Sequence, residues 1–130
     1  MSSNAPILEG TGPLVSDRYI ITLTAAVAIT MGQFVEISTD WTIDIPAAAN
    51  SLKVAGIALI NQPNIGGSVS VVCRGLCRAI SGGVINAGDQ ITNGTNGQVI
   101  TDNASKNSTI RGIALSSATA AGQVVYILLW

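Results

Sequence analysis

The chain has 130 residues, which is enough for one compact domain with a modest hydrophobic core. Its six Lys and Arg residues nearly balance seven Asp and Glu residues, and the basic residues are scattered along the chain. Phosphate binding needs a concentrated basic patch, so nucleic acid is not expected as the main partner. Only 10% of the residues are charged and 48% are hydrophobic, so we expect much of the surface to be buried against other chains; a monomeric barrel with an apolar surface is the alternative.

Residues 1–17 are expected to form an extended N-terminal arm. The arm has neither the basic n-region nor the apolar h-region of a secretion signal. The longest apolar-leaning stretch, residues 20–31, is interrupted by threonines and is shorter than the roughly 20 residues that a membrane helix needs. We therefore expect no membrane partner, and a protein that is made in a cytoplasm and used there or in a particle assembled there.

From residue 18 onward, short β-branched runs alternate with turn-forming residues, and no segment carries the apolar stripe of an amphipathic helix. Trp41, Ile43 and Ile45 are expected on one side of a strand, with Thr42 and Asp44 on the other. The pattern predicts an all-β fold. Strands are expected near residues 18–24, 33–38, 41–45, 53–60, 67–73, 75–80, 89–92, 98–101, 109–116 and 122–129.

An internal duplication organises these strands. VAGIAL at residues 54–59 and IRGIAL at residues 110–115 are 56 residues apart, and the same shift aligns Arg18 with Arg74 and Gly32 with Gly88. We infer that one residue drops out after Leu59, so that residues 67–69 align with 122–124. The chain then divides into unit one (residues 18–73) and unit two (residues 74–130). Each unit is too short to bury its own apolar faces well, so we expect a single β domain, residues 18–130, with one shared core.

The duplication also settles local assignments. Residues 24–29 contain enough alanine for a helix, but their counterpart, residues 80–85, contains two glycines, so both are expected to be loops that lead into turns at Gly32 and Gly88. Asp89 and its counterpart Gln33 follow these glycines and are expected to cap backbone donors. The dipeptides Asn93-Gly94 and Asn96-Gly97 are typical of turns with positive φ.

The repeated strings predict the burial of two isoleucines. Ile57 and Ile113 lie between small residues in the two GIAL segments, and both are expected in the core. Residues 124–130 are apolar on both faces of a strand. One of those faces can enter the core, and the other must be covered by the other unit or by a neighbouring chain.

The sequence carries little that indicates catalysis. Histidine is absent, no glycine-rich phosphate loop is present, and nothing favours a carboxylate pair among the seven acidic residues. We therefore expect no enzyme activity, no catalytic residue and no bound cofactor. Cys73 and Cys77 are too few for a metal site of about four ligands and are expected to be reduced, buried thiols, with a disulfide as the alternative.

The ordered pieces of the two units resemble the capsid cement (head decoration) proteins of tailed bacteriophages, a family long catalogued as a domain of unknown function. These pieces are INAGDQI (residues 85–91), NGQVIT (96–101), IRGIALSSATAAGQVVYILL (110–129) and VAGIALINQPNIGGSVSVVCRG (54–75). The resemblance covers most of the chain after Asp17. It implies a small β-barrel or tulip-like domain on the outside of the phage head, commonly a trimer, which binds the major capsid protein and reinforces contacts between its subunits.

Candidate contact residues for the capsid or another partner chain lie mainly in the arm, whose apolar positions suit strand addition to a neighbour. They are Pro6, Ile7, Leu8, Leu14, Val15 and, at the other end of the sequence, Trp130. Other structural roles in a virion, such as a head-fibre base or a tail-tube component, are alternatives, and a ligand-binding β module is a further one.

Overall fold

A computed structural model describes residues 18–102 and 109–130, and the expected arm lies outside these residues. The described chain is all-β, as the sequence predicts, with one short 3₁₀ segment, η1 (Thr95–Gly97). The strands are β1 (Tyr19–Ala25), β2 (Phe34–Thr39), β3 (Thr42–Asp44), β4 (Val54–Ala58), β5 (Ser68–Ile80), β6 (Gln90–Asn93), β7 (Val99–Thr101), β8 (Gly112–Ala114) and β9 (Val124–Leu129).

Unit one closes into a five-stranded barrel. Its strands are hydrogen-bonded in the order β1-β3-β2-β4-β5, and β1 pairs again with β5 to complete the ring. The β1–β3 pair is parallel and the other pairs are antiparallel. Closure leaves no free sheet edge in this unit, which removes a site of unwanted strand pairing.

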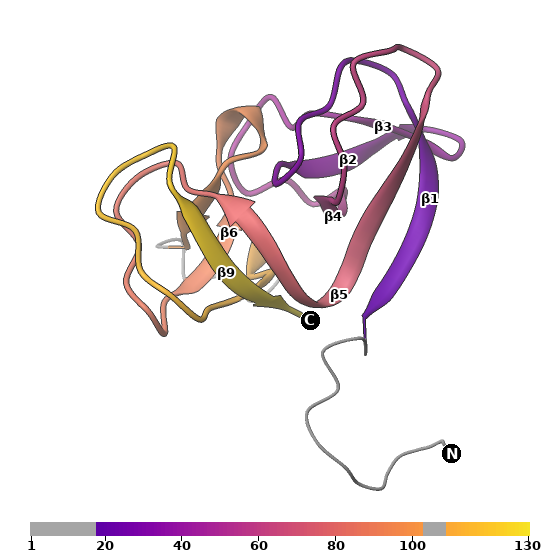
Figure 1. The fold of residues 1–130 in the computed structure, drawn as a ribbon. Helices are drawn as coiled ribbons and strands as arrows, with labels where there is room; N and C mark the ends of the chain where they lie inside the picture. The colour runs from indigo at the N-terminus through magenta and orange to yellow at the C-terminus, as the bar shows by residue number, and fades with distance from the viewer. Residues whose placement is uncertain (1–17, 103–108) are drawn as a thin grey trace, which may run out of the picture.

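Unit two repeats this arrangement. Its strands follow the order β5-β9-β8-β6-β7, and a parallel bridge between Ser81 and Val99 joins the end of β5 to β7. This bridge is the counterpart, 56 residues on, of the parallel pair Ala25–Ile43 that links β1 and β3. The two barrels stand side by side and are joined by β5, which bends between them (Figure 1).

The strand register keeps the 56-residue shift through both units. Residues that follow Leu59 keep this shift. The pair Ala58–Val71 corresponds to Ala114–Ile127, and the pair Leu23–Val69 corresponds to Ala79–Val125, each 56 residues on. The residue inferred to drop out after Leu59 is therefore not missing. Gly66, with φ +87°, matches Gly122, with φ +85°, at the same turn, and this turn geometry outweighs the similarity of the strings that suggested the gap.

The structure also corrects the expectation of two strands at residues 67–73 and 75–80. β5 is one continuous strand of 13 residues, whose first half pairs with β1 and β4 and whose second half pairs with β9. Gly75 lies between the halves with φ +102°, a conformation that glycine adopts easily, so the chain bends there without leaving the sheet.

The repeated GIAL string has a steric cause. A Cβ atom on Gly56 would lie 2.0 Å from the Val72 carbonyl oxygen, and one on Gly112 would lie 2.1 Å from the Leu128 carbonyl oxygen. Both glycines therefore let β4 and β8 approach the neighbouring strand. The two strings occupy equivalent strands, as the duplication predicts.

The turn expectations are partly confirmed. Gly32 and Gly88 both have φ +92°, and the Gln33 and Asp89 side chains accept hydrogen bonds from the Thr30 and Asn86 backbone N–H groups, as expected for capping residues. Asn96 and Gly97 have positive φ. Gly94 has φ −91° because it follows directly on β6 as extended backbone, so that turn expectation is wrong.

Trp41 does not share the inward face with Ile43. It has φ +54° in the turn before β3, which breaks the alternation, and its side chain is 73% exposed, whereas Ile43 is buried and Ile45 is half-buried.

The described core consists of two buried clusters rather than the expected single one. The first fills barrel one and includes Leu23, Ile43 and Val71. The second fills barrel two, but it also contains Phe34, Ile57 and Val72 of unit one. These three side chains join the two units because they leave their own barrel and pack on the interior of the other.

Polar contacts complete the junction between the units. The Asn93 side chain donates to the Ala48 carbonyl oxygen over 2.9 Å and accepts from the Ser51 backbone N–H over 2.9 Å. The Arg111 guanidinium donates to the Ser51 carbonyl oxygen. Asn93 is fully buried, so these hydrogen bonds satisfy groups that would otherwise destabilise the interface.

Ile57 and Ile113 differ in burial although they occupy equivalent positions. Ile57 is fully buried beneath unit two, while Ile113 is only half-buried. We predict that Ile57→Ala lowers the free energy of unfolding by about 2–5 kcal/mol, because a cavity forms at the junction. Ile113→Ala should cost about 1 kcal/mol or less. Urea unfolding followed by circular dichroism measures both losses, and equal losses would contradict the assigned difference in burial.

Candidate functional site

The outward side of β9 carries a row of exposed apolar side chains. Val125, Ile127 and Leu129 point into barrel two and are buried. The alternate residues point outward and are between 40% and 55% exposed. They are Val124, Tyr126, Leu128 and Trp130.

Neighbouring strands widen this row. On β5, Leu76, Arg78 and Ile80 lie directly opposite Leu128, Tyr126 and Val124. On the other side, Ile113 of β8 lies opposite Leu128, and the Leu115 backbone N–H donates to the Tyr126 carbonyl oxygen over 2.8 Å. We call this surface the β9 face: Leu76, Arg78, Ile80, Ile113, Leu115, Val124, Tyr126, Leu128 and Trp130.

Unit one has a surface equivalent to part of the β9 face, because its strands pair in the same register. The outward residues of its β1 and of the first half of β5 are mostly small and hydroxylated. Thr22, Thr24, Ser68 and Ser70 stand where unit two has Arg78, Ile80, Val124 and Tyr126. Hydroxyl side chains suit a surface that meets water, so the apolar residues of unit two are not required by the fold. They indicate a surface that another molecule covers.

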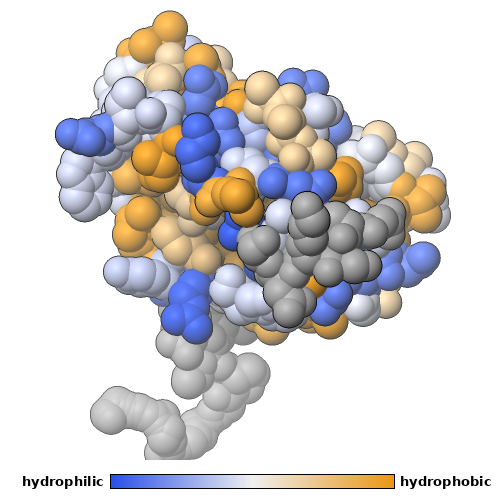
Figure 2. Space-filling view, turned by 180° about the vertical axis from the view of Figure 1, so that it is seen from behind, coloured by the Kyte–Doolittle hydropathy of each residue, from blue (hydrophilic) through white to orange (hydrophobic). Residues whose placement is uncertain are grey.

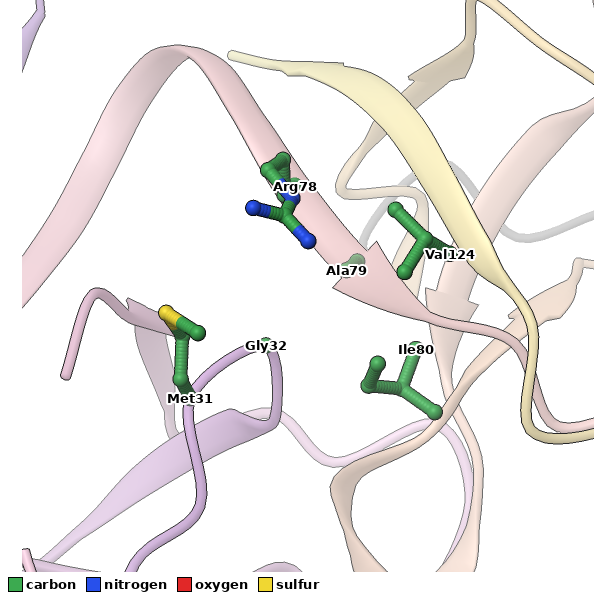
Figure 3. Close-up of a pocket in the computed structure, with 6 residues that line it drawn as sticks. All are labelled: Met31, Gly32, Arg78, Ala79, Ile80 and Val124. Atoms are coloured by element: carbon green, nitrogen blue, oxygen red, sulfur yellow. The ribbon is translucent and has the colours of Figure 1, made fainter. Parts of the chain in front are cut away.

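A shallow hollow lies at one end of the β9 face. Met31 and Gly32 of unit one border it on one side, and Arg78, Ile80 and Val124 border it on the other (Figure 3). The Ile80 backbone N–H donates to the Gly32 carbonyl oxygen over 3.2 Å and joins the two sides of the lining. Arg78 is the charged group in the lining, so the hollow extends an apolar contact surface and lacks the several polar groups that orient a cofactor.

A second hollow lies at the junction of the units, beside Cys73, Arg111 and Trp130. Burial lowers the pKa of Arg111, and the negative charge of Asp102 acts in the opposite direction. Because the Arg111 guanidinium already bonds the Ser51 carbonyl oxygen, we assign this residue a structural role.

Exposed apolar residues also occur elsewhere. They include Tyr19, Trp41, Leu52 and Ile65, which come from separate loops and strand ends of unit one. On the side seen in Figure 2, apolar residues form small patches separated by polar ones. None of these residues belongs to a row like that of β9.

The sequence-predicted contact residues divide into two groups. Trp130 lies at the end of the β9 face and is 55% exposed. Pro6, Ile7, Leu8, Leu14 and Val15 lie outside the described residues. Tyr126 and Leu128 were not singled out from the sequence, although the expectation that one face of residues 124–130 needs a cover already pointed to them.

The two cysteines are free thiols, Cys77 buried and Cys73 half-buried. Burial raises the pKa of the Cys77 thiol to about 12, with the positive charge of Arg18 acting in the opposite direction, and burial also raises the pKa of Cys73. Across residues 18–102 and 109–130, no group of three or more His, Cys, Asp or Glu residues is placed to hold a metal ion. No helix in these ranges is long and apolar enough to cross a membrane.

Comparison with known proteins identifies the family. The phage cement protein family matches residues 15–129. The chain belongs to this family. Membership makes this cement protein a structural component of the phage virion that associates with the capsid, in agreement with the resemblance found in the sequence.

A solved structure supports the fold of the cement protein. The crystal structure of the N base of head fiber gp8.5 in bacteriophage phi29 has a TM-score of 0.67 and 22% sequence identity, and the match covers 87% of this chain and 94% of that one. At this identity the likeness shows the fold alone. No curated protein matches the chain significantly.

The cysteine environment gives a testable prediction. The thiolate is the reactive form of cysteine, so a thiol with a pKa of about 12 stays unreactive near neutral pH. We predict that iodoacetamide at pH 8 leaves Cys77 unmodified in the folded Cys73→Ser variant and alkylates it fully after unfolding. Mass spectrometry reads the result, and rapid alkylation of the folded variant would contradict the burial of Cys77.

Proposed function

We propose that this cement protein binds the outside of the assembled phage head and stabilises contacts between major capsid subunits without turning over any substrate. The observation that supports the proposal best is the β9 face. It carries large apolar side chains at exposed positions where the equivalent surface of unit one carries serine and threonine. The sequence offers no histidine for acid–base chemistry, which agrees with a structural role.

The proposed stabilisation is additive. Each copy covers a seam between shell subunits, and burial of apolar surface contributes about 25 cal/mol per Å² before the costs of association. A protein that binds only the assembled shell shifts the assembly equilibrium by mass action. Many symmetric copies then make the shell more resistant to heat and chelators.

The arm completes the proposed attachment. Residues 1–17 precede β1, whose first residue, Tyr19, pairs with Arg74 beside the bend of β5, and Leu129 pairs with Gly75 at the same bend. The start of β1 therefore lies near the end of β9, and we propose that the apolar residues of the arm contact the same neighbour as the β9 face. We further propose a trimer, as the family resemblance implies, and assembly onto the shell in the host cytoplasm.

The proposal is tested by adding purified protein to shells that lack it, then pelleting and heating them. The double variant Tyr126→Ser/Leu128→Ser should weaken binding about tenfold or more, because large residues near the centre of an interface supply most of its energy. Ile20→Ser is the matched control, since Ile20 is the exposed counterpart of Leu76 in unit one and should bind normally. Failure of the unmodified protein to bind or protect shells would contradict the proposed function.

The same assay tests the arm. Deleting residues 1–17 removes Pro6, Ile7, Leu8, Leu14 and Val15 and should weaken attachment, while circular dichroism shows that the barrels stay folded. Equal binding by the full-length and deleted proteins would remove the arm from the attachment.

A further inference from the structure

Two exposed arginines of β5 lie at the β9 face: Arg78 belongs to it, and Arg74 lies beside the bend of the strand. Leu76 and Arg78 are two residues apart on the second half of β5, so both point to the outward side of that half, and Arg74 is exposed just before the bend at Gly75. Arg78 lies directly opposite Tyr126. Neither arginine forms a hydrogen bond or ion pair through its guanidinium with any part of the chain that the structure describes. Both therefore present charged donors to solvent beside the apolar row.

A third arginine lies at the same end of the molecule. Arg18 is exposed and precedes Tyr19, which pairs with Arg74. Its charge also reaches the Cys77 thiol in the second half of β5. The pairing of β1 with β5 thus brings Arg18, which comes much earlier in the sequence, near Arg74 and Arg78.

The described acidic residues lie on other elements. Glu36 and Asp44 face each other on β2 and β3, and Asp40 is in the turn between those strands. Asp89 and Asp102 lie at the same end of the antiparallel β6–β7 pair, and the Asp89 carboxylate accepts hydrogen bonds from the Asn86 N–H and the Thr101 hydroxyl. The strands that form the β9 face, β5, β8 and β9, carry no acidic side chain, so Arg74 and Arg78 make the charge on these strands positive.

We propose that the β9 face together with Arg74 and Arg78 is a single docking surface for a shell-protein surface that is apolar and carries carboxylates. This inference rests on the proposed function and names the chemistry of the partner. A guanidinium offers a planar fork of donors that matches a carboxylate, and it also stacks on aromatic rings. Arginine, tyrosine and tryptophan beside aliphatic residues form the composition typical of the energetic centre of a protein interface.

The internal duplication supports the contribution of Arg78, whereas Arg74 aligns with another arginine, Arg18. The position of Arg78 in unit one is occupied by Thr22, which is also exposed. Arginine at this position is therefore not needed to form the barrel. Arg78 occurs in unit two, whose outward residues are large and apolar. Thr22 takes its place in unit one, whose outward residues are mostly hydroxylated.

A second copy of the chain fits this surface less well. Its densest acidic region is the β2–β3 hairpin, but Glu36 there accepts a hydrogen bond from the Ser51 hydroxyl, and Asp44 accepts one from the Ile45 N–H. Lys53 also lies beside this hairpin, since its carbonyl oxygen accepts from the Ile37 N–H. This hairpin of a neighbouring copy would thus offer mainly Asp40.

The test compares the full-length protein with Arg74→Glu/Arg78→Glu in the shell-pelleting assay. The reversal should weaken binding about tenfold or more, because carboxylates of the partner would then meet like charges. Lys53→Glu, which reverses an exposed charge on unit one, should bind like the unmodified protein. Binding of the unmodified protein should also fall as salt rises from about 50 to 500 mM, and the reversed variant should lose most of this dependence.

The outcomes separate the inference from the proposed function. If the unmodified protein binds shells and the reversed variant binds equally well, the docking surface is wrong while the cement function stands. If light scattering shows that the reversal dissociates an oligomer of the free protein, the surface pairs copies of the chain and the shell is not its occupant. If the unmodified protein binds no shell, both proposals are overturned. Unfolding curves of each variant confirm that it is folded.

Discussion

The molecule depends on one shared strand. β5 closes barrel one with its first half and begins barrel two with its second half, so the two units cannot move independently without breaking its hydrogen bonds. The bend at Gly75 sets the angle between them and brings Phe34, Ile57 and Val72 of unit one onto the interior of barrel two. Most of the hydrophobic contact between the units follows from this arrangement.

The shared strand also makes the two units unequal. An outward surface of unit one is covered by unit two, whereas the corresponding surface of unit two is partly exposed. Val72 is fully buried, but Leu128, its counterpart 56 residues on, is 40% exposed. In this chain the surface is enlarged with Tyr126 and Trp130, which is expected if a partner outside the chain covers it.

Inside the barrels the two units have changed little, because the packing constraint is the same in both. The GIAL glycines remain where a Cβ atom would collide with a neighbouring carbonyl oxygen, and Gly32 and Gly88 remain at turns with positive φ. Outside the barrels no such constraint applies. Differences between equivalent outward positions of the two units therefore indicate whether each surface faces solvent or a partner.

Much of the fold could be predicted from the sequence, because alternation and duplication are local signals that survive in the residues. The all-β class, the equivalent GIAL strands and the capping roles of Gln33 and Asp89 were within reach. The continuity of β5 was not, since a glycine between two apolar runs is typical of both a bend and a break. The half-burial of Ile113 was not either, because a repeat predicts equal environments and only the assembled structure shows which copy lacks a neighbour.

The candidate site could also be predicted only in part from the sequence. Trp130 was identified because the final strand is apolar on both faces, a pattern that requires a cover. The arginines could not be placed with it, because Arg74 and Arg78 are about 50 residues from β9 in sequence and come beside it only through the pairing of β5 with β9. Their contribution to the surface depends on topology, which alternation does not reveal.

The most direct test of the account is a reconstruction of the phage head by electron cryomicroscopy at a resolution that shows side chains. The account predicts that Tyr126, Leu128 and Arg78 contact the shell, while Thr22 and Ser70, the unit-one counterparts of Arg78 and Tyr126, face solvent. A map in which the Thr22 and Ser70 side of unit one lies on the shell and the β9 face is open to solvent would contradict it.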